Sequence, residues 1–214
     1  MAKSTIDEIE RVVETRDKRS SRISFEYDSI MNRFHENIED VVAKFSIADS
    51  ITDENQKKEI WRSQIVFLES SLDFYLHEVI KFGFIKMFNE EWAGTNGFKK
   101  FSVSLGFAIE FAKHPENAET LLNEIDKGNH KLCFMHFDNI IRNLRLIDIK
   151  ISFPDKDIIN EIYRRRNQIA HQTDRNPPET EKQDIAKDHV ERYIKKIKAL
   201  VETIDEAIKK KDRS

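Results

Sequence analysis

The chain has 214 residues, of which 35% are charged and 39% hydrophobic, and its formal net charge at pH 7 is −3. It contains only 5 glycines and 4 prolines, and neither residue type occurs in 1–82 or 179–214. Sandwiches, barrels and propellers need turn residues about every 8–12 positions, which this chain does not supply. The composition therefore predicts an all-α fold built from long helices.

Several functional classes are excluded by absent patterns. The chain has neither G-x-x-x-x-G-K-[ST] nor G-x-G-x-x-G, so the common phosphate-binding loops are missing and we expect no cofactor. Its single cysteine, Cys133, allows no internal disulfide and no cysteine-rich zinc site. The first residues lack the apolar segment of a secretory signal, and the uncharged run 101–109 is too short to span a bilayer. We expect a cytoplasmic protein without a membrane segment, in which any nucleic-acid site is a local basic patch.

The N-terminal region predicts a long helical extension, residues 1–50. Its apolar residues recur at steps of three and four between 6 and 45, which is helical spacing. One unbroken helix over this range would be about 60 Å long, so we expect a break near 17–21 or a projecting arm. The near-heptad stripe over 23–45 leaves two alternatives open, a coiled-coil-like contact with a partner or packing on its own bundle.

Residues 51–214 predict a single helical domain. A helix over about 53–91 is apolar around much of its circumference in 65–80 and belongs in the middle of a bundle. The clearest loop follows at 92–97, and shorter helices are predicted over 102–113 and 116–126, separated by a proline.

Three further helices complete the predicted bundle. The first covers about 130–147, with its inner face formed by Phe134, Phe137, Ile141, Leu144 and, within the same stripe, Cys133. The second begins after Ser152-Phe-Pro-Asp155 and continues through His171. The last begins at the capping-box pattern Thr180-Glu-Lys-Gln183.

The helix that ends near His171 carries the most informative cluster. On a helical wheel centred on Ile162, Ile158, Ile159 and Ile169 define the buried face. Arg166 lies at about 40° from Ile162, at the edge of that face, whereas Asn167 and His171 lie near 140° and 180° and are i,i+4 neighbours. A guanidinium rarely lies beside an apolar face without a partner anion, either a carboxylate or a phosphate.

The spacing Arg166-x4-His171 suits phosphate chemistry on RNA. Arginine can bind a phosphate through two hydrogen bonds and stabilise developing charge, and histidine can take or give a proton near neutral pH. The RNA 2′-OH supplies the nucleophile, so neither a metal nor a protein nucleophile is required. The alternative is a solvated, basic helix end with His171 as an ordinary surface residue.

The segment Arg165-Arg-Asn-Gln-Ile-Ala-His171 resembles the HEPN family, whose small α-bundles carry Arg-x4–6-His late in the chain. The central segment Leu68-Glu-Ser-Ser-Leu-Asp-Phe-Tyr-Leu-His-Glu-Val79 resembles an early helix of the RiboL-PSP branch of that family. The resemblance implies a metal-independent endoribonuclease that leaves 2′,3′-cyclic phosphate and 5′-OH ends. In it, Arg166 would bind the scissile phosphate, His171 would act as base or acid, and Asn167 would occupy the polar position after the arginine.

The resemblance also implies a homodimer in which two Arg–His pairs face one cleft, often in a toxin or antiviral-defence effector with an antitoxin or activating partner. Arg164 and Arg165 satisfy the permitted spacings too, but the asparagine after Arg166 favours that residue. HEPN toxins paired with a nucleotidyltransferase antitoxin carry Arg-x4-His-x-Tyr and are nucleotidylated on the tyrosine. This chain has Thr173 at that position, which argues against regulation by that route.

Other residues extend or compete with this hypothesis. Arg142 and Arg145, together with Arg164 and Arg165, could hold an RNA backbone, although a charged helix face is the simpler explanation for the first two. The pattern His130-x2-Cys133-x2-His136 has metal-like residue types, but helical spacing separates its ends and no fourth ligand is near, so no metal site is predicted. The histidine of the central segment, His77, is expected to be a satisfied core or edge residue.

Three functions therefore remain open from the sequence. The first is a HEPN-type endoribonuclease acting on RNA. The second is a catalytically inactive HEPN-like interaction module of a defence complex, which would bury Arg166 and His171 in an ion pair without an open cleft. The third is a coiled-coil scaffold, with His171 in bulk solvent.

Overall fold

The computed structural model describes residues 23–114, 118–175, 178 and 181–214. Within these residues the chain forms eight α-helices and one short 3₁₀ helix, and no strand. They are α2 (Tyr27–Ser50), α3 (Glu54–Phe88), α4 (Asn96–Lys99), α5 (Leu105–Lys113), α6 (Ala118–Asn129), α7 (Phe137–Leu144), η1 (Arg145–Ile147), α8 (Lys156–Gln172) and α9 (Lys187–Asp212). The predicted all-α bundle is confirmed.

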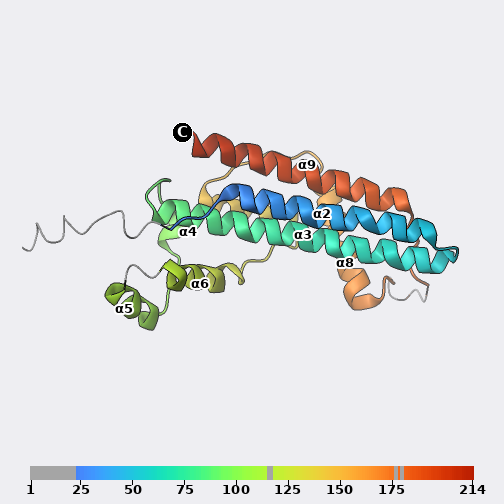
Figure 1. Cartoon of the computed structure of the whole chain (residues 1–214), viewed down its shortest axis with the longest axis horizontal. Helices are drawn as coiled ribbons and strands as arrows, with labels where there is room; N and C mark the ends of the chain where they lie inside the picture. The colour runs from blue at the N-terminus through green and yellow to red at the C-terminus, as the bar shows by residue number, and fades with distance from the viewer. Residues whose placement is uncertain (1–22, 115–117, 176–177, 179–180) are drawn as a thin grey trace, which may run out of the picture.

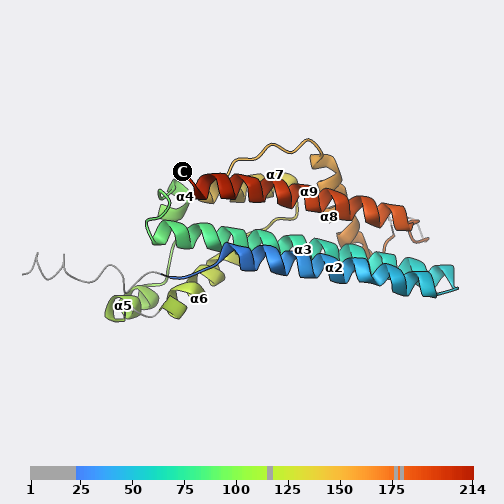
Figure 2. The ribbon, with the colours of Figure 1, turned by 45° about the horizontal axis from the view of Figure 1, so that its top comes forward.

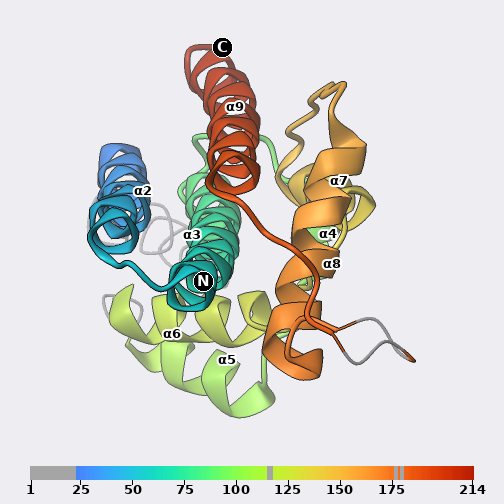
Figure 3. The same cartoon turned by 90° about the vertical axis from the view of Figure 1, so that its right-hand side faces the viewer.

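The central helix of the bundle is α3. The Asp53 side chain caps it by accepting hydrogen bonds from the backbone N–H groups of Asn55 and Gln56. Helices on different sides contact α3, namely α2, α6, α7, α8 and α9. In the end-on view of Figure 3, α2 and α9 lie beside α3, α5 and α6 lie beneath it, and α7 and α8 lie on the remaining side. This surrounding explains why the sequence of α3 is apolar around its circumference.

The N-terminal stripe packs on its own bundle. Figures 1 and 2 both show α2 lying along α3, and Phe34, Ile38 and Val41 on its inner face are buried. Just before α2, the backbone N–H of Ile23 donates to Oδ1 of Asn89, and Nδ2 of Asn89 donates to the Ile23 carbonyl. These two bonds connect the chain before α2 to the residue that follows α3. The break expected at 17–21 lies outside the described residues, and the division of the chain at residue 50 stays a prediction.

One glycine permits a close approach between helices. A Cβ atom added to Gly83 in α3 would lie 2.4 Å from Cγ2 of Ile147 in η1, whose side chain is completely buried. The contact is possible only because Gly83 has no side chain. It holds the end of the α7–η1 segment against the core, and this segment leads into α8.

The helix predicted over 130–147 is wrong in its first half, because α7 begins only at Phe137. The preceding residues are not helical, which allows Phe134 to pack edge-on against the His77 ring in the core. His136 then starts the helix, since its Nδ1 accepts a hydrogen bond from the backbone N–H of Asp138. Cys133, expected in the inner stripe, is exposed.

The capping box predicted at 180–183 is also wrong. Residues 181–186 are not helical, and α9 begins at Lys187. The backbone carbonyl of Gln183 accepts a hydrogen bond from Arg62 of α3, so this segment crosses between helices instead of starting one. Thr180 lies outside the described residues.

The other predicted helices are present with shifted ends. The predicted helices 53–91, 102–113 and 116–126 correspond to α3, α5 and α6. The loop predicted at 92–97 is shorter, because the Thr95 hydroxyl accepts a hydrogen bond from the Phe98 backbone N–H and caps α4. In the described part of the chain, none of the helices combines the length and the apolar character needed to cross a bilayer.

Candidate active site

The candidate site is built on α8. Ile159, Ile162 and Tyr163 are buried and hold the helix on the bundle, whereas Ile158 and Ile169 are only half-buried. The helix ends at Thr173 in the left-handed conformation, with φ 51°. One turn of α8 therefore precedes a sharp change of direction, and His171 lies exposed in that last turn.

Three consecutive arginines on α8 have three different surroundings, because successive helical residues point about 100° apart. Arg164 is exposed and lines the same open depression as Asn167 and His171. The depression has a volume of about 550 Å³. It is lined by residues from α8 and from the segment before α7: Met135, His136, Asn160, Arg164, Asn167, Gln168, His171 and Gln172.

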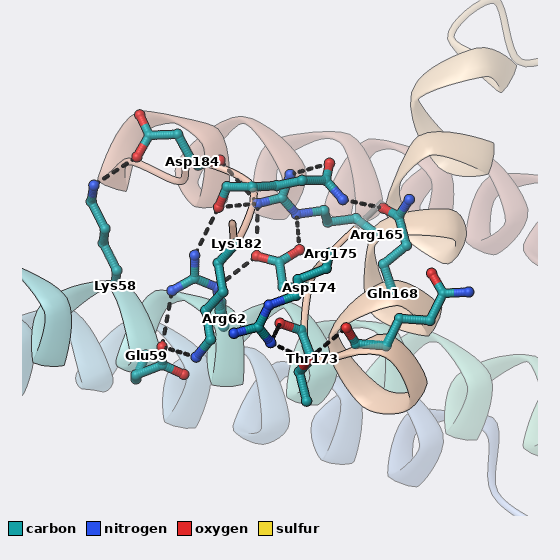
Figure 4. Close-up of polar contacts among 12 residues, drawn as sticks. Lys58, Glu59, Arg62, Arg165, Gln168, Thr173, Asp174, Arg175, Lys182 and Asp184 are labelled. Atoms are coloured by element: carbon teal, nitrogen blue, oxygen red, sulfur yellow. Dashed lines mark hydrogen bonds and ion pairs between the residues drawn. The ribbon is translucent and has the colours of Figure 1, made fainter. Parts of the chain in front are cut away.

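Arg165 is part of a buried ionic cluster (Figure 4). Its Nη2 donates to Oδ2 of Asp174 at 3.0 Å, and Arg62 of α3 donates to the same oxygen through Nε at 2.6 Å. The Asp174 side chain is fully buried. Arg165 and Arg62 also both donate to the Gln183 backbone carbonyl. The cluster thus ties the loop after α8 to α3 and holds Arg165 away from the depression.

Arg166 lies between two depressions. Its Nε is 2.9 Å from Oε2 of Glu69, a buried carboxylate on α3, and its Nη1 donates to Oδ1 of Asn167 at 3.2 Å. Arg166 lines a second depression of about 700 Å³ beside α3, while Asn167 lines the first, and Met135 lines both. The i,i+4 contact predicted from Asn167 was to His171, but in the structure the Asn167 carbonyl accepts from Arg166.

The electrostatics of Glu69 follow from its burial. Burial raises the pKa of its carboxyl above the ordinary value of 4.5, Arg166 opposes this shift, and neighbouring Asp73 adds to it. The Arg166 guanidinium supplies the compensating positive charge for a carboxylate that would otherwise be costly to bury.

A family model described as RiboL-PSP-HEPN matches residues 32–210, from within α2 to the last turns of α9. The chain belongs to the RiboL-PSP-HEPN family. This confirms the resemblance, predicted over about 55–205, and extends it to residues 32–50 of α2. Membership points to a HEPN-type ribonuclease. No curated protein and no solved structure matches the chain.

Two further predicted RNA-binding residues of this RiboL-PSP-HEPN chain, Arg142 and Arg145, lie outside both depressions. Arg142 in α7 and Arg145 in η1 are exposed, and neither is among the residues that line those depressions. Their predicted contact with RNA stays a prediction, as does that of Arg164. The contact predicted for Arg165 now competes with its pairing to Asp174.

The metal-like pattern is dispersed in the RiboL-PSP-HEPN fold. His130 lies beside the His77 ring, Cys133 is exposed, and His136 faces the first depression. Within the described residues, no group of three or more histidine, cysteine, aspartate or glutamate residues could hold a metal ion. His77 is a satisfied edge residue, since its Nδ1 lies 3.3 Å from Oδ1 of Asn129.

Sequence reasoning missed the contribution of the segment before α7 to the site. His136 and Met135 line the depression together with residues of α8 that lie about 30 positions later in the chain. In the sequence, His136 belongs only to the metal-like pattern with His130 and Cys133. The available signal was its position directly before Phe137-Asp138, which is typical of a residue that begins a helix.

Proposed function

We propose that the chain is an endoribonuclease that cleaves RNA without a metal ion. His171 takes the proton of a 2′-OH, the 2′-oxygen attacks the adjacent phosphorus, and the bond to the 5′-oxygen breaks. The products are a 2′,3′-cyclic phosphate and a 5′-OH end. The reaction needs one proton acceptor at the ribose and positive charge at the phosphate.

The observation that carries this proposal is the open depression around His171. Its volume of about 550 Å³ lies within the usual range for ligand sites. His171 and Arg164 are both exposed there, on the same face of α8. Asn167 lies between them and is hydrogen-bonded to the Arg166 guanidinium. A proton acceptor and positive charge therefore meet at one concave surface.

The arginines divide into one structural and two functional residues. Arg165 is neutralised by Asp174 and stabilises the loop after α8. Arg166 binds the scissile phosphate through the guanidinium edge that Asn167 orients, as its position in the motif implies. Arg164, on the same wall as His171, holds an adjacent phosphate of the RNA backbone.

Assembly and biological role are proposed from the family. Two copies of the chain form a homodimer whose depressions open into one cleft, so that each RNA strand meets both Arg–His pairs. The protein acts as a toxin or an antiviral-defence effector, as family members often do. An RNase without regulation would damage its own cell, so its activity has to be controlled. An antitoxin or an activating partner controls it.

One observation favours the alternative of a catalytically inactive HEPN-like module. Arg166 is already paired with Glu69, and the Glu69 side chain is only 7% exposed. In such a module this ion pair would be permanent and would serve stability alone. The exposed His171 on an open depression favours the nuclease.

Cleavage of total tRNA by the purified protein in excess EDTA tests the proposal. We expect cyclic-phosphate ends, and a loss of about 10²–10⁴-fold in rate for His171→Ala, because a positioned acid or base contributes this much. Arg166→Ala should lose cleavage as well. Arg192→Ala, which removes an exposed arginine of α9 that pairs with Glu161 of α8, is the matched control and should cleave normally. A folded wild-type dimer that leaves tRNA intact would favour the inactive module.

A further inference from the structure

The second depression, beside α3, adjoins the residue that binds the scissile phosphate in the proposed reaction. It has a volume of about 700 Å³ and lies between α3 and the residues that connect α6 to α7. Arg166 lines it, and Met135 lines both this depression and the one around His171. An RNA strand with a phosphate at Arg166 can therefore place a neighbouring nucleoside here.

Asp73 offers an unused carboxylate in this depression. It lies one turn after Glu69 on the same face of α3, so the two Cβ atoms are about 6 Å apart. The Glu69 carboxylate is already paired with Arg166, whereas the Asp73 side chain is 42% exposed. Nε2 of His77 lies 3.6 Å from Oδ2 of Asp73, which is too far for a hydrogen bond. Asp73 can therefore accept hydrogen bonds from a ligand bound next to Arg166.

The other walls of the depression suit a flat, partly apolar ring. Phe74 and Leu132 line it from α3 and from the connecting segment. Met135 is 46% exposed where the two depressions meet, although it is a large apolar side chain. Unstacked nucleobases bind to proteins by stacking their faces on aromatic side chains while their edges form hydrogen bonds. The depression supplies both kinds of surface.

One buried polar group behind this wall lacks a partner. Tyr163 on α8 is 2% exposed, and within the described residues its hydroxyl has no hydrogen-bond partner. Burial raises the pKa of this hydroxyl, and the charges of Glu69, Asp73 and Cys133, which all line the depression, raise it further. The hydroxyl thus lies on the side of the depression. Because buried hydroxyls normally have a partner, an occupant with polar atoms would complete this wall.

We propose that the second depression binds a guanine nucleobase next to the phosphate at Arg166, with Asp73 accepting hydrogen bonds from N1–H and the N2 amino group. This inference rests on the proposed endoribonuclease function and names the nucleotide beside which the RNA is cleaved. Of the four nucleobases, only guanine has two neighbouring donors on its Watson–Crick edge. Adenine and cytosine have one donor beside an acceptor, and uracil has one donor between two carbonyls. A carboxylate only accepts hydrogen bonds, so it matches guanine and is repelled by the acceptors of the others.

Four RNA oligonucleotides test this assignment, identical except for one central nucleoside, which is guanosine, 7-deazaguanosine, inosine or adenosine. Inosine lacks the N2 amino group, whereas 7-deazaguanosine keeps the whole Watson–Crick edge. We expect the wild type to cleave beside guanosine and 7-deazaguanosine equally well, more slowly beside inosine, and about 10–100-fold more slowly beside adenosine. Asp73→Asn turns an amide N–H toward N1–H of guanine, so it should cleave the guanosine and adenosine oligonucleotides at similar rates. The ratio of the two rates reports recognition, because a general loss of stability would lower both.

The control is Glu54→Gln. It removes an exposed carboxylate from the first turn of the same helix, where Glu54 pairs with Lys57, and should keep the wild-type preference. A wild type that cleaves without preferring guanosine, or an Asp73→Asn variant with the wild-type preference, overturns the assignment of this depression and leaves the nuclease proposal standing. A wild type that cleaves neither the oligonucleotides nor total tRNA overturns the proposed function and this inference with it.

Discussion

Replacement of Asp174 by asparagine should destabilise the fold more than any comparable change at the surface. The carboxylate is fully buried and accepts hydrogen bonds from Arg62 at 2.6 Å and from Arg165 at 3.0 Å. Hydrogen bonds to charged groups contribute about 1.5–3 kcal/mol each. Asp174→Asn also leaves two guanidiniums facing each other without the anion between them. Breaking a buried pair in this way costs about 3–5 kcal/mol.

Thermal and urea unfolding, followed by circular dichroism at pH 7, measure this loss. For a chain of this length, a loss of about 4 kcal/mol corresponds to a fall in Tm of roughly 8–16 °C. Asp184→Asn is the matched control, because Asp184 lies in the same connecting segment and pairs with Lys58 in an exposed position. It should lower the midpoint only slightly, because exposed ion pairs contribute little to stability. Two variants with similar midpoints would refute the argument that the buried cluster holds the loop to α3.

Two further predictions concern packing and pH. Gly83→Ala should destabilise the fold by about 1–3 kcal/mol, because the new methyl would lie 2.4 Å from the buried Ile147. Gly106→Ala in α5, with nothing within 4 Å, should leave the stability to urea unchanged or slightly raised, because alanine favours a helix more than glycine does. Burial raises the pKa of Glu69 above 4.5, so the folded state keeps this proton at pH values where the unfolded state has released it. The contribution of Glu69 to stability therefore falls as pH rises from 4.5 through its folded pKa. Glu69→Gln should reduce the change of Tm with pH in that range. A dependence of Tm on pH that runs parallel to wild type would contradict this.

The long helices could be predicted from the sequence because their apolar spacing is regular over many turns. The failures lie where a distant residue decides the local structure. The stretch before α7 has helical spacing, but burying Phe134 against His77 needs an irregular backbone. Likewise, the pattern at 180–183 fits a helix start, but the Gln183 carbonyl is bound by Arg62, more than a hundred positions earlier.

The candidate site could be predicted only as far as α8 itself. His171 and Asn167 were recognised from their helical spacing, and both line the depression. The different environments of the three arginines could not be predicted, because Asp174 and Glu69 become their partners only through tertiary packing. The same reason hid His136, which shares no helix with the other site residues.

The cluster around Asp174 has a consequence for the order of synthesis. Arg62 and Asp174 are separated by 112 positions, so the ribosome completes most of the bundle before the second of them exists. The turn after His171 therefore forms its contacts with Arg62 and Arg165 only late, after Asp174 has been synthesised. Contacts so distant along the chain also form slowly. During synthesis, the turn after His171 therefore lacks this ionic cluster until Asp174 has been added and has met Arg62.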